Sequence, residues 1–246
     1  MVDKVALIDG DIIPYEYGNC KDSDGNLLKW QYVQSRVQSR IDGIMDATGA
    51  DRYRIWLSDP VNNFRKEIAT ILPYKGNRPS EKPYYWAKIR EFLIRYRKAS
   101  ITDWIEADDQ LGIDQCEAEG YDTVICSVDK DLDMIPGDHY NWRKGKYYTI
   151  SKIEGERNLY KQMLTGDSVD NILGLYGVGP KSAHVKAIDQ MDNVNDMFFH
   201  VMDRYRERFG SYCTKFYVEN GILLRILSST EEADEWREEM KDDRKE

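Results

Sequence analysis

The sequence predicts an α/β fold with a mainly parallel central sheet and helices on both faces. Short apolar runs alternate with helical patterns through the first 165 residues, as they do in βαβ units. Beyond about residue 165 the strand signal ends and helical patterns alone continue. A chain of 246 residues is long enough for one such domain with a smaller helical region attached.

Each element is predicted from its local pattern. Apolar and β-branched runs predict strands at 4–8, 52–57, 101–105 and 121–128, and a hairpin at 140–150 that turns at Lys144-Gly145. Apolar residues at three- and four-residue spacing predict helices at 30–45, 83–97, 107–120, 151–164, 181–191, 193–209 and 212–227, with a short helical turn at 132–135. Residues 64–83 are basic and rich in proline, which predicts an irregular segment.

Charge is distributed unevenly along the chain. Between Arg65 and Lys98 there are ten Lys and Arg residues and three acids, whereas residues 230–246 carry nine acids and four bases. The net charge of −9 argues against a nucleic-acid partner, but a local basic face beside an acidic pocket suits a phosphate backbone. We therefore divide the chain into a core at 1–165 with a basic arch at about 64–100, a helical region at 166–229, and an acidic tail at 230–246 that is either a solvated helix or disordered.

Composition excludes several classes of protein. The four cysteines and three histidines are scattered without zinc-type spacing, which predicts reduced thiols and no histidine metal site. No apolar run approaches the ~20 residues of a membrane span, and the start of the chain lacks the layout of a signal peptide. We expect a cytoplasmic monomer that does not contact a membrane.

Nine carboxylates gather where predicted strands end or predicted helices begin. Because the carboxyl ends of parallel strands share one edge of the sheet, these acids should lie close together. Like charges at short range need a counter-ion, and Mg²⁺ with oxygen ligands fits best. The expected metal ligands are Asp9, Asp59, Glu106, Asp108, Asp109, Asp129, Asp131, Asp167 and Asp170.

Helix capping is the alternative explanation for single acids in this set. It accounts for Glu106 or Asp109 alone, because acids at a helix start complement its dipole. It does not account for all the strand-end groups together, so we favour a metal-dependent enzyme acting on phosphates. Asp11 and Asp133 are expected outside the ligand set, in supporting or solvated positions.

Two further segments predict contact with DNA. The run Gly-Val-Gly-Pro-Lys is typical of a helix–hairpin–helix, whose backbone N–H groups hold a phosphate without reading sequence, although a plain helix corner has the same pattern. In the basic segment, Lys75 and Arg78 are spaced to reach one phosphate, and the ring of Tyr74 can stack on a nucleobase. The alternative is that the charged residues form an ordinary solvated surface. The expected DNA contacts are Arg65, Tyr74, Lys75, Arg78, Lys82, Gly177, Gly179 and Lys181.

Six motifs together resemble the flap endonuclease and 5′→3′ exonuclease family, which includes the N-terminal nuclease domain of bacterial DNA polymerase I and stand-alone phage exonucleases. They lie between Ala6 and about Ala187 and read Ile-Asp-Gly, Phe-Arg-x-Glu, Tyr-Lys-x-Asn-Arg, Glu-Ala-Asp-Asp, Ser-Val-Asp-Lys-Asp-Leu and Leu-Thr-Gly-Asp-Ser-Val-Asp-Asn. The spelling looks most like phage replication exonucleases. The resemblance implies a PIN-like 5′ nuclease fold with a helical arch and a C-terminal helix–hairpin–helix subdomain.

The resemblance also implies a chemistry: hydrolysis of DNA phosphodiesters with two Mg²⁺ ions, for which Mn²⁺ can substitute, leaving 5′-phosphate products. The implied catalytic residues are Lys75, Arg78, Asp129 and Asp131. One metal group would come from Asp9, Asp59, Glu106 and Asp108, and the other from Asp109, Asp129, Asp131, Asp167 and Asp170. The family's hairpin, matched by Gly177 and Gly179, can also hold K⁺.

The expected substrates are DNA with 5′ ends, nicks or flaps, in phage-type replication that includes primer removal and DNA degradation. The location would be the cytoplasm of a bacterium or a phage-infected host, with a replication polymerase acting in trans. Pro14-Tyr15-Glu16-Tyr17 stands where the family often has an arginine. Two alternatives stay open: an RNase H-like 5′ nuclease acting on RNA–DNA hybrids, and a catalytically silent binder of DNA junctions.

Overall fold

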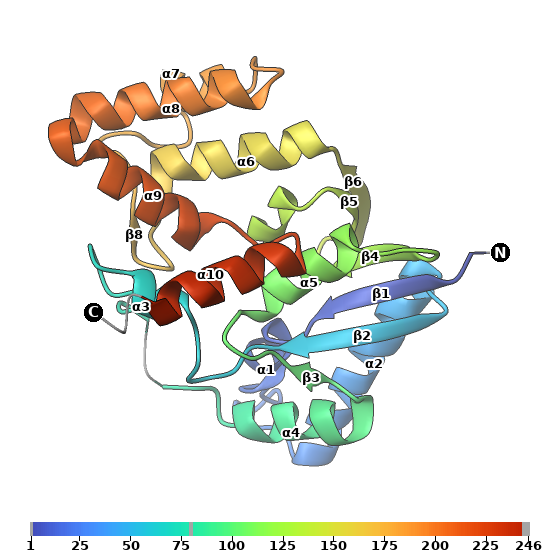
Figure 1. Cartoon of the computed structure of the whole chain (residues 1–246). Coiled ribbons are helices and arrows are strands. Elements are labelled where there is room, and N and C mark those ends of the chain that lie inside the picture. Colours follow the sequence, from blue (N-terminus) through green and yellow to red (C-terminus); the bar gives the residue numbers. More distant parts are fainter. Residues whose placement is uncertain (1, 79–80, 243–246) are drawn as a thin grey trace.

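The computed structural model describes residues 2–78 and 81–242, and its centre is a six-stranded sheet (Figure 1). The strands run in the order β3-β2-β1-β4-β5-β6, and in the described residues every pair is parallel except β5 with β6. The strands are β1 (Lys4–Asp9), β2 (Arg52–Leu57), β3 (Ser100–Ile101), β4 (Asp122–Cys126), β5 (Gly137–Asn141) and β6 (Lys146–Ile150). The predicted mainly parallel sheet is confirmed.

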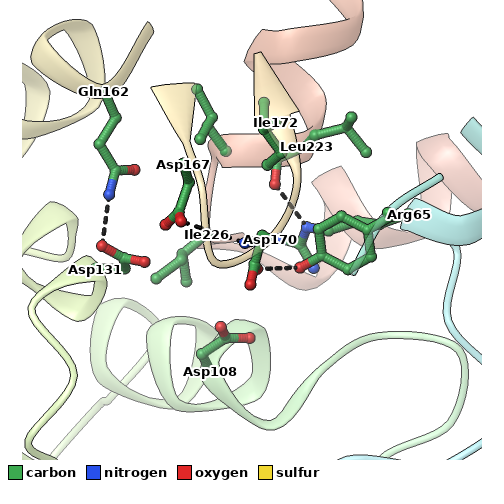
Figure 2. A pocket seen from close by; sticks show the side chains of 11 residues that line it. Arg65, Asp108, Asp131, Gln162, Asp167, Asp170, Ile172, Leu223 and Ile226 are labelled. Carbon is green, nitrogen blue, oxygen red and sulfur yellow. Dashed lines mark hydrogen bonds between the residues drawn. The ribbon is translucent and has the colours of Figure 1, made fainter. Parts of the chain in front are cut away.

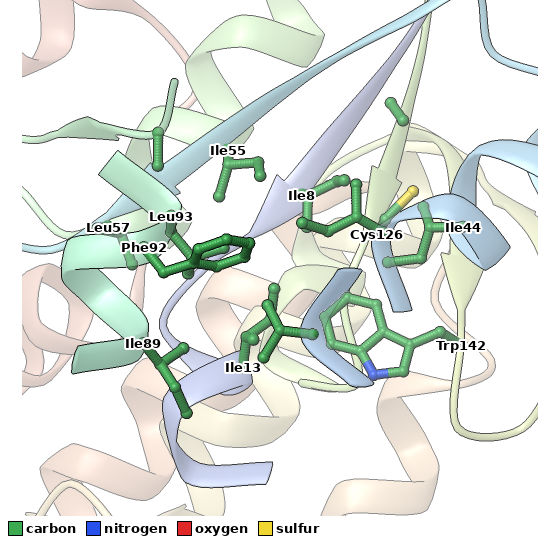
Figure 3. Packing of buried hydrophobic residues seen from close by; sticks show 14 of the residues in the cluster. Ile8, Ile13, Ile44, Ile55, Leu57, Ile89, Phe92, Leu93, Cys126 and Trp142 are labelled. Carbon is green, nitrogen blue, oxygen red and sulfur yellow. The ribbon is translucent and has the colours of Figure 1, made fainter. Parts of the chain in front are cut away.

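Helices cover both faces of this sheet, as predicted. One face packs against α1 (Ile12–Tyr17), α2 (Trp30–Thr48) and α4 (Trp86–Arg97), and the other against α5 (Ala107–Cys116). Side chains alternate along β1, so Ala6 and Ile8 enter the first cluster while Val5 and Leu7 enter the second. Figure 3 shows the first cluster, in which residues of the sheet face those of the helices: Ile8, Ile13, Ile44, Ile55, Leu57, Ile89, Phe92, Leu93, Cys126 and Trp142.

The segment expected to form a helical arch is mostly irregular. It contains the four-residue helix α3 (Arg65–Ile68), and residues 69–78 and 81–85 have no helix or strand. The next helix, α4, begins three residues later than predicted and buries Phe92 and Leu93 against the sheet, while Tyr96 is 66% exposed. Prolines and Gly76 explain the irregular stretch, because proline cannot continue a helix and glycine weakens it.

The last third of the chain builds a second core beside the sheet. Its helices are α6 (Lys152–Thr165), α7 (Ala183–Ile188), α8 (Val194–Phe209) and α9 (Cys213–Leu224), with short 3₁₀ turns η1 (Asp131–Met134) and η2 (Gly210–Tyr212). Between α6 and α7 lies a hairpin that the sequence did not predict, β7 (Gly166–Asp167) with β8 (Ile172–Leu173). A Cβ atom at Gly166 would lie 2.2 Å from the backbone nitrogen of Gly174, so only glycine allows this tight pairing.

The acidic C-terminal segment forms α10 (Thr230–Asp242), which lies along α5 in Figure 1. Of the two alternatives predicted for it, the helix is correct, and its first turns are docked. Trp236 packs on the cluster around Phe64 and Trp104, and Arg237 donates to a carboxyl oxygen of Asp103 over 2.9 Å. Residues 243–246 of the predicted tail lie outside the described residues. None of the helices between residues 2 and 242 combines the length and hydropathy needed to cross a membrane.

A buried ion pair connects the two cores. Arg65 is 2% exposed and donates to Asp109 over 2.6 and 2.7 Å. Its other N–H groups donate to the carbonyl oxygens of Leu223 and Arg225 and, over 3.3 Å, to the carboxylate of Glu106. The backbone N–H of Leu227 donates to the same Asp109 carboxylate over 3.0 Å. The expected DNA contact of Arg65 is therefore wrong, because its charge is used inside the fold.

Replacing Arg65 by Met should destabilise the fold strongly, because it leaves the buried Asp109 without its partner. We expect the free energy of unfolding to fall by about 3–5 kcal/mol. Urea unfolding followed by circular dichroism measures this change. The control is Arg52→Met, which removes a solvent-exposed pair with Asp3 and should cost less than about 1 kcal/mol. Similar losses in both variants would contradict a structural role for the buried pair.

Candidate active site

The carboxyl ends of the parallel strands open into a cleft of about 1250 Å³. Its walls come from the edge of the sheet, the irregular basic segment and the turn between β7 and β8. The acids that line it include Asp9, Asp11, Glu106, Asp108, Asp129, Asp131, Asp167 and Asp170. The bases that line it are Lys75, Arg78, Lys82 and Lys130. The predicted gathering of acids at one sheet edge thus corresponds to a real cleft.

Asp9 is the last residue of β1 and lies at the floor of the cleft. A Cβ atom on the next residue, Gly10, would lie 2.4 Å from the carbonyl oxygen of Trp56, so glycine lets the chain turn directly after the acid. The hydroxyl of Ser127 donates to Asp9 over 2.7 Å. Burial, helped by repulsion from Asp11, raises the pKa of Asp9 to about 7.

Glu106 and Asp108 lie at the start of α5 and have opposite electrostatic environments. Glu106 contacts the ammonium of Lys75 and accepts a hydrogen bond of 2.6 Å from the hydroxyl of Tyr74. Burial would raise the pKa of Glu106, but Lys75 and then Arg65 outweigh it and lower the pKa to about 2. Asp108 has its pKa raised well above the usual value by burial and by the nearby carboxylates of Asp109 and Glu106.

Four acids face a small cavity of about 20 Å³ between the sheet edge and the second core. Figure 2 shows Asp108 from α5, Asp131 from η1, and Asp167 and Asp170 from the β7–β8 hairpin around this space. Gln162 of α6 donates to Asp131. Burial and then repulsion by Asp129 and Asp167 raise the pKa of Asp131 to about 7.

Lys75 and Arg78 reach the acids from the opposite wall. Arg78 contacts the carboxylate of Asp170, and the Lys75 ammonium lies 3.6 Å from the same carboxylate as well as touching Glu106. The backbone of Lys75 has a φ of 56°, a left-handed conformation that costs energy for a residue with a side chain. Its N–H donates to the carbonyl oxygen of Asp170 over 2.8 Å, which holds the strained backbone in place.

Two of the predicted roles are corrected by this geometry, and a third predicted residue lies outside the cleft. Asp109 cannot be a metal ligand, because it is fully buried and its oxygens accept from Arg65, Leu227 and the backbone of Glu106. Tyr74 cannot stack on a base, because its ring is 7% exposed and its hydroxyl is held by Glu106 and Asp170. Asp59 is not among the residues that line the cleft, and one oxygen of its carboxylate accepts from the backbone N–H groups of Val61 and Asn62.

The remaining predicted DNA contacts lie at the two ends of the cleft. Gly177, Gly179 and Lys181 are exposed on the turn beyond β8, where Gly177 has a φ of +79°, and Pro180 of the same turn lines the cleft. Lys82 lies at the other end and donates to the hydroxyl of Tyr15 over 2.7 Å. The structure therefore brings the acids, Lys75 and Arg78 together and keeps the hairpin glycines separate from them.

Three residues that support the site differ in how clearly the sequence indicates them. Asp11 lines the cleft, where its carboxylate accepts from the backbone of Ser58 and from Arg90 over 2.8 Å. The sequence predicted Asp11 outside the ligand set in a supporting or solvated position, and these contacts agree with the supporting alternative. Ser127 precedes Asp129 and could have been found as a polar residue at a strand end. Gln162 gave no signal, because its partner is 31 residues away.

The donor set of the cleft fits a hard divalent cation. All of its acids offer oxygen, and Asp9, Asp108 and Asp131 have raised pKa values that a cation would relieve. As the side chains stand, no three His, Cys, Asp or Glu residues in the described ranges converge closely enough to hold one ion. Binding of a metal therefore requires these carboxylates to turn toward a common point.

Asp9 and Asp131 give stability a defined dependence on pH. Their folded-state pKa values of about 7 exceed the ordinary 3.8, so between these values the folded state binds more protons than the unfolded state. Stability in EDTA should therefore fall as the pH rises from about 5 to 7.5. Thermal unfolding across this range measures the slope.

Asp9→Asn should flatten this slope, because the variant cannot ionise at that position. Asp59→Asn is the matched control. Backbone N–H groups of Asn62 and Val61 lower the pKa of Asp59, so it titrates below the window and its loss should leave the slope unchanged. An Asp9→Asn variant with the wild-type slope would show that Asp9 is not the group that titrates.

Known proteins resemble the chain in sequence and in fold. No model of a protein family matches the chain. The chain is similar to DNA polymerase I of Rhizobium leguminosarum, at 37% identity over 135 residues that cover 49% of this chain and 13% of that protein. It is also similar to the flap endonuclease Xni of Shewanella sp. strain MR-4, at 30% identity over 146 residues that cover 52% of this chain and 54% of that protein. The chain thus matches about half or less of the length of these relatives.

Among solved structures, the chain is similar to the D15 flap endonuclease of bacteriophage T5, in a complex with DNA and metal ions. The TM-score is 0.58 at 16% identity, and the match covers 90% of this chain and 99% of that one. An identity this low shows the fold alone, which is a 5′ nuclease fold. The predicted resemblance to the flap endonuclease and 5′→3′ exonuclease family is therefore confirmed, in sequence over about half of the chain and in fold over about nine tenths of it.

Proposed function

We propose that this chain is a structure-dependent 5′ nuclease that hydrolyses DNA phosphodiesters at 5′ ends, nicks or flaps. The observation that carries the proposal is a single cleft in which clustered carboxylates face Lys75 and Arg78. A protein that only binds phosphate gains nothing from acids there, because they repel it. The similarity to Xni and to the T5 flap endonuclease supports the same activity.

The cofactor in this proposal is a pair of Mg²⁺ ions, for which Mn²⁺ can substitute. Asp9, Glu106 and Asp108 would hold one ion and Asp129, Asp131, Asp167 and Asp170 the other, partly through water. Bound there, such ions activate water as a nucleophile and stabilise the leaving oxygen. Asp109 is left out of the ligand set because its oxygens already accept from Arg65. Asp59 is left out because it is not among the residues that line the cleft.

Lys75 and Arg78 have two alternative sets of partners in this scheme. They contact Glu106 and Asp170, and a phosphate in the cleft would offer them a second anionic partner at the same place. Their positive charges would then neutralise the charge that develops on the phosphate during attack. Because Lys75 is mostly buried and its backbone is fixed by Asp170, its ammonium is aimed at the acids before DNA arrives.

The substrate is recognised by shape in this proposal. The backbone N–H groups around Gly177 and Gly179 would hold a phosphate of duplex DNA, with Lys181 beside them and K⁺ as a further ligand of the turn. Such contacts carry no sequence information, so we infer that cleavage depends on junctions and strand ends. We also infer that the products carry a 5′-phosphate. An RNA strand paired with DNA is a second substrate that the same backbone contacts accept.

The proposed setting is phage-type DNA replication, in the cytoplasm of a bacterium or an infected host. Removal of primers and degradation of DNA are both tasks that a 5′ nuclease can perform, and a polymerase would act in trans. A silent junction binder is the second candidate. One observation favours it: no three carboxylates of the described residues converge on one point, and Lys75 and Arg78 already neutralise two of them.

Cleavage assays separate these two functions. With 5′-labelled nicked and 5′-flap duplexes, we expect mononucleotides or short 5′-phosphorylated pieces with Mg²⁺ and none with EDTA. Asp131→Asn should lower the single-turnover rate by about 100-fold or more while DNA affinity changes little. The control is Asp133→Asn, because Asp133 accepts from Tyr148 outside the cleft. Tight binding without cleavage in Mg²⁺ and in Mn²⁺ would establish the silent binder instead.

Lys75→Ala tests whether the ammonium of Lys75 stabilises the charge on the phosphate during cleavage. Loss of the ammonium removes charge stabilisation at the phosphate, so we expect the cleavage rate to fall by about 100-fold. Lys144→Ala, in the exposed turn between β5 and β6, is a control with the same change in net charge and should cleave like the wild type. A Lys75→Ala variant that cleaves at the wild-type rate would remove this residue from the site.

A further inference from the structure

The segment that carries Lys75 and Arg78 has no regular structure of its own, so other elements must hold it. Its far end docks on the turn between β7 and β8. There Asn77 donates to the carbonyl oxygen of Ser168 over 2.6 Å, and Asn171 donates to that of Pro73 over 2.9 Å. These contacts fix residues 73–78, but they leave the stretch between α3 and Pro73 to be fixed by something else.

Glu219 of α9 provides that second anchor. Its carboxyl group is buried, with the residue 6% exposed, and one oxygen accepts from the backbone N–H groups of Thr70 and Ile71, each over 2.8 Å. The other oxygen accepts from the Thr70 hydroxyl over 2.6 Å. Both oxygens are therefore used by the segment that leads to Tyr74 and Lys75.

The surroundings of Glu219 favour a positioning role over a contribution to stability alone. In the described part of the chain its carboxyl group forms no ion pair, and it lies in an otherwise largely apolar helical sequence, Phe-Tyr-Val-Glu-Asn-Gly-Ile-Leu-Leu. Burying an acid without a basic partner is unfavourable, and an apolar residue would pack there at lower cost. Among the described residues, the hydrogen bonds to this carboxyl group come from the backbone N–H groups of Thr70 and Ile71 and from the Thr70 hydroxyl, all in the basic segment.

We propose that Glu219 is a positioning residue for Lys75 and Arg78. It fixes the backbone four residues before Tyr74, so that the short path to Lys75 cannot shift and the ammonium stays aimed into the cleft. This role rests on the proposed nuclease function. It assigns Glu219 no contact with substrate or metal, since the residue does not line the cleft.

Hydrogen exchange tests the anchor without any need for activity. In Glu219→Ala the amides of Thr70 and Ile71 lose their acceptor, so their exchange should become at least about tenfold faster. Glu219→Gln should restore protection, because its amide oxygen can accept from both N–H groups and its NH₂ can donate to the Thr70 hydroxyl. Gln115→Ala, which removes a buried hydrogen bond to Pro136, is the control for general destabilisation and should leave these amides protected.

Single-turnover cleavage of a 5′-flap duplex then tests the consequence for Lys75. Glu219→Ala should slow cleavage by about 10- to 100-fold with little change in DNA affinity, and Glu219→Gln should recover the rate. Combining Glu219→Ala with Lys75→Ala should be no slower than Lys75→Ala alone, because both changes remove one function. Additive losses, or a Glu219→Ala variant as fast as an active wild type, would overturn the role. A wild-type chain that cleaves neither substrate would overturn the nuclease proposal and this role with it.

Discussion

Arg65 and Asp109 form an ion pair that is almost closed to solvent, and it joins three segments that are far apart in the sequence. Arg65 starts α3, Asp109 belongs to the first turn of α5, and the carbonyl oxygens of Leu223 and Arg225 come from the end of α9. A buried pair of this kind is held by complete hydrogen bonding and not by Coulomb attraction alone, since desolvation opposes it. Because α5 also presents Glu106 and Asp108, the pair sets the position of the acids relative to the basic segment. The second core is attached to the sheet through the same contact.

The carboxylates in the cleft repel one another, and the fold reduces this repulsion in two different ways. Toward the β7–β8 hairpin, Lys75 and Arg78 neutralise Glu106 and Asp170 directly. Toward the sheet, the donors to Asp9 and Asp131 among the described residues are a hydroxyl, a side-chain amide and a backbone N–H group, and burial raises their pKa values to about 7. Near neutral pH these acids are therefore poised between the charged and neutral forms. Clustered carboxylates attract cations, but their mutual repulsion destabilises the folded state. This is the exchange of stability for function that is expected at a functional site.

Much of this site could be predicted because parallel strands bring their carboxyl ends to one edge whatever the rest of the fold does. That rule alone placed Asp9 and Asp131 together. It could not decide the orientation of single acids. Asp109 is explained by the capping box that it forms with Glu106, the simpler alternative, and by Arg65 from 44 residues away. The prediction that Tyr74 stacks on a base was wrong for a related reason. An aromatic residue in a basic segment is expected to be exposed unless long-range partners such as Asp170 are known. Contacts of this range leave no periodic pattern in a sequence.

The turn between β7 and β8 shows how the two candidate DNA contacts are mechanically related. It supplies Asp167 and Asp170 to the cleft, and its backbone carbonyl groups accept from Asn77 and from Lys75. After β8 the chain passes within a few residues to the exposed glycines at 177 and 179. The element that would hold a duplex and the element that would hold the phosphate to be cut therefore share one rigid support. In the proposed function the fold sets the span between them, so a substrate would have to present duplex and 5′ end at matching separation, and selectivity for strand ends would follow without any contact to a base edge.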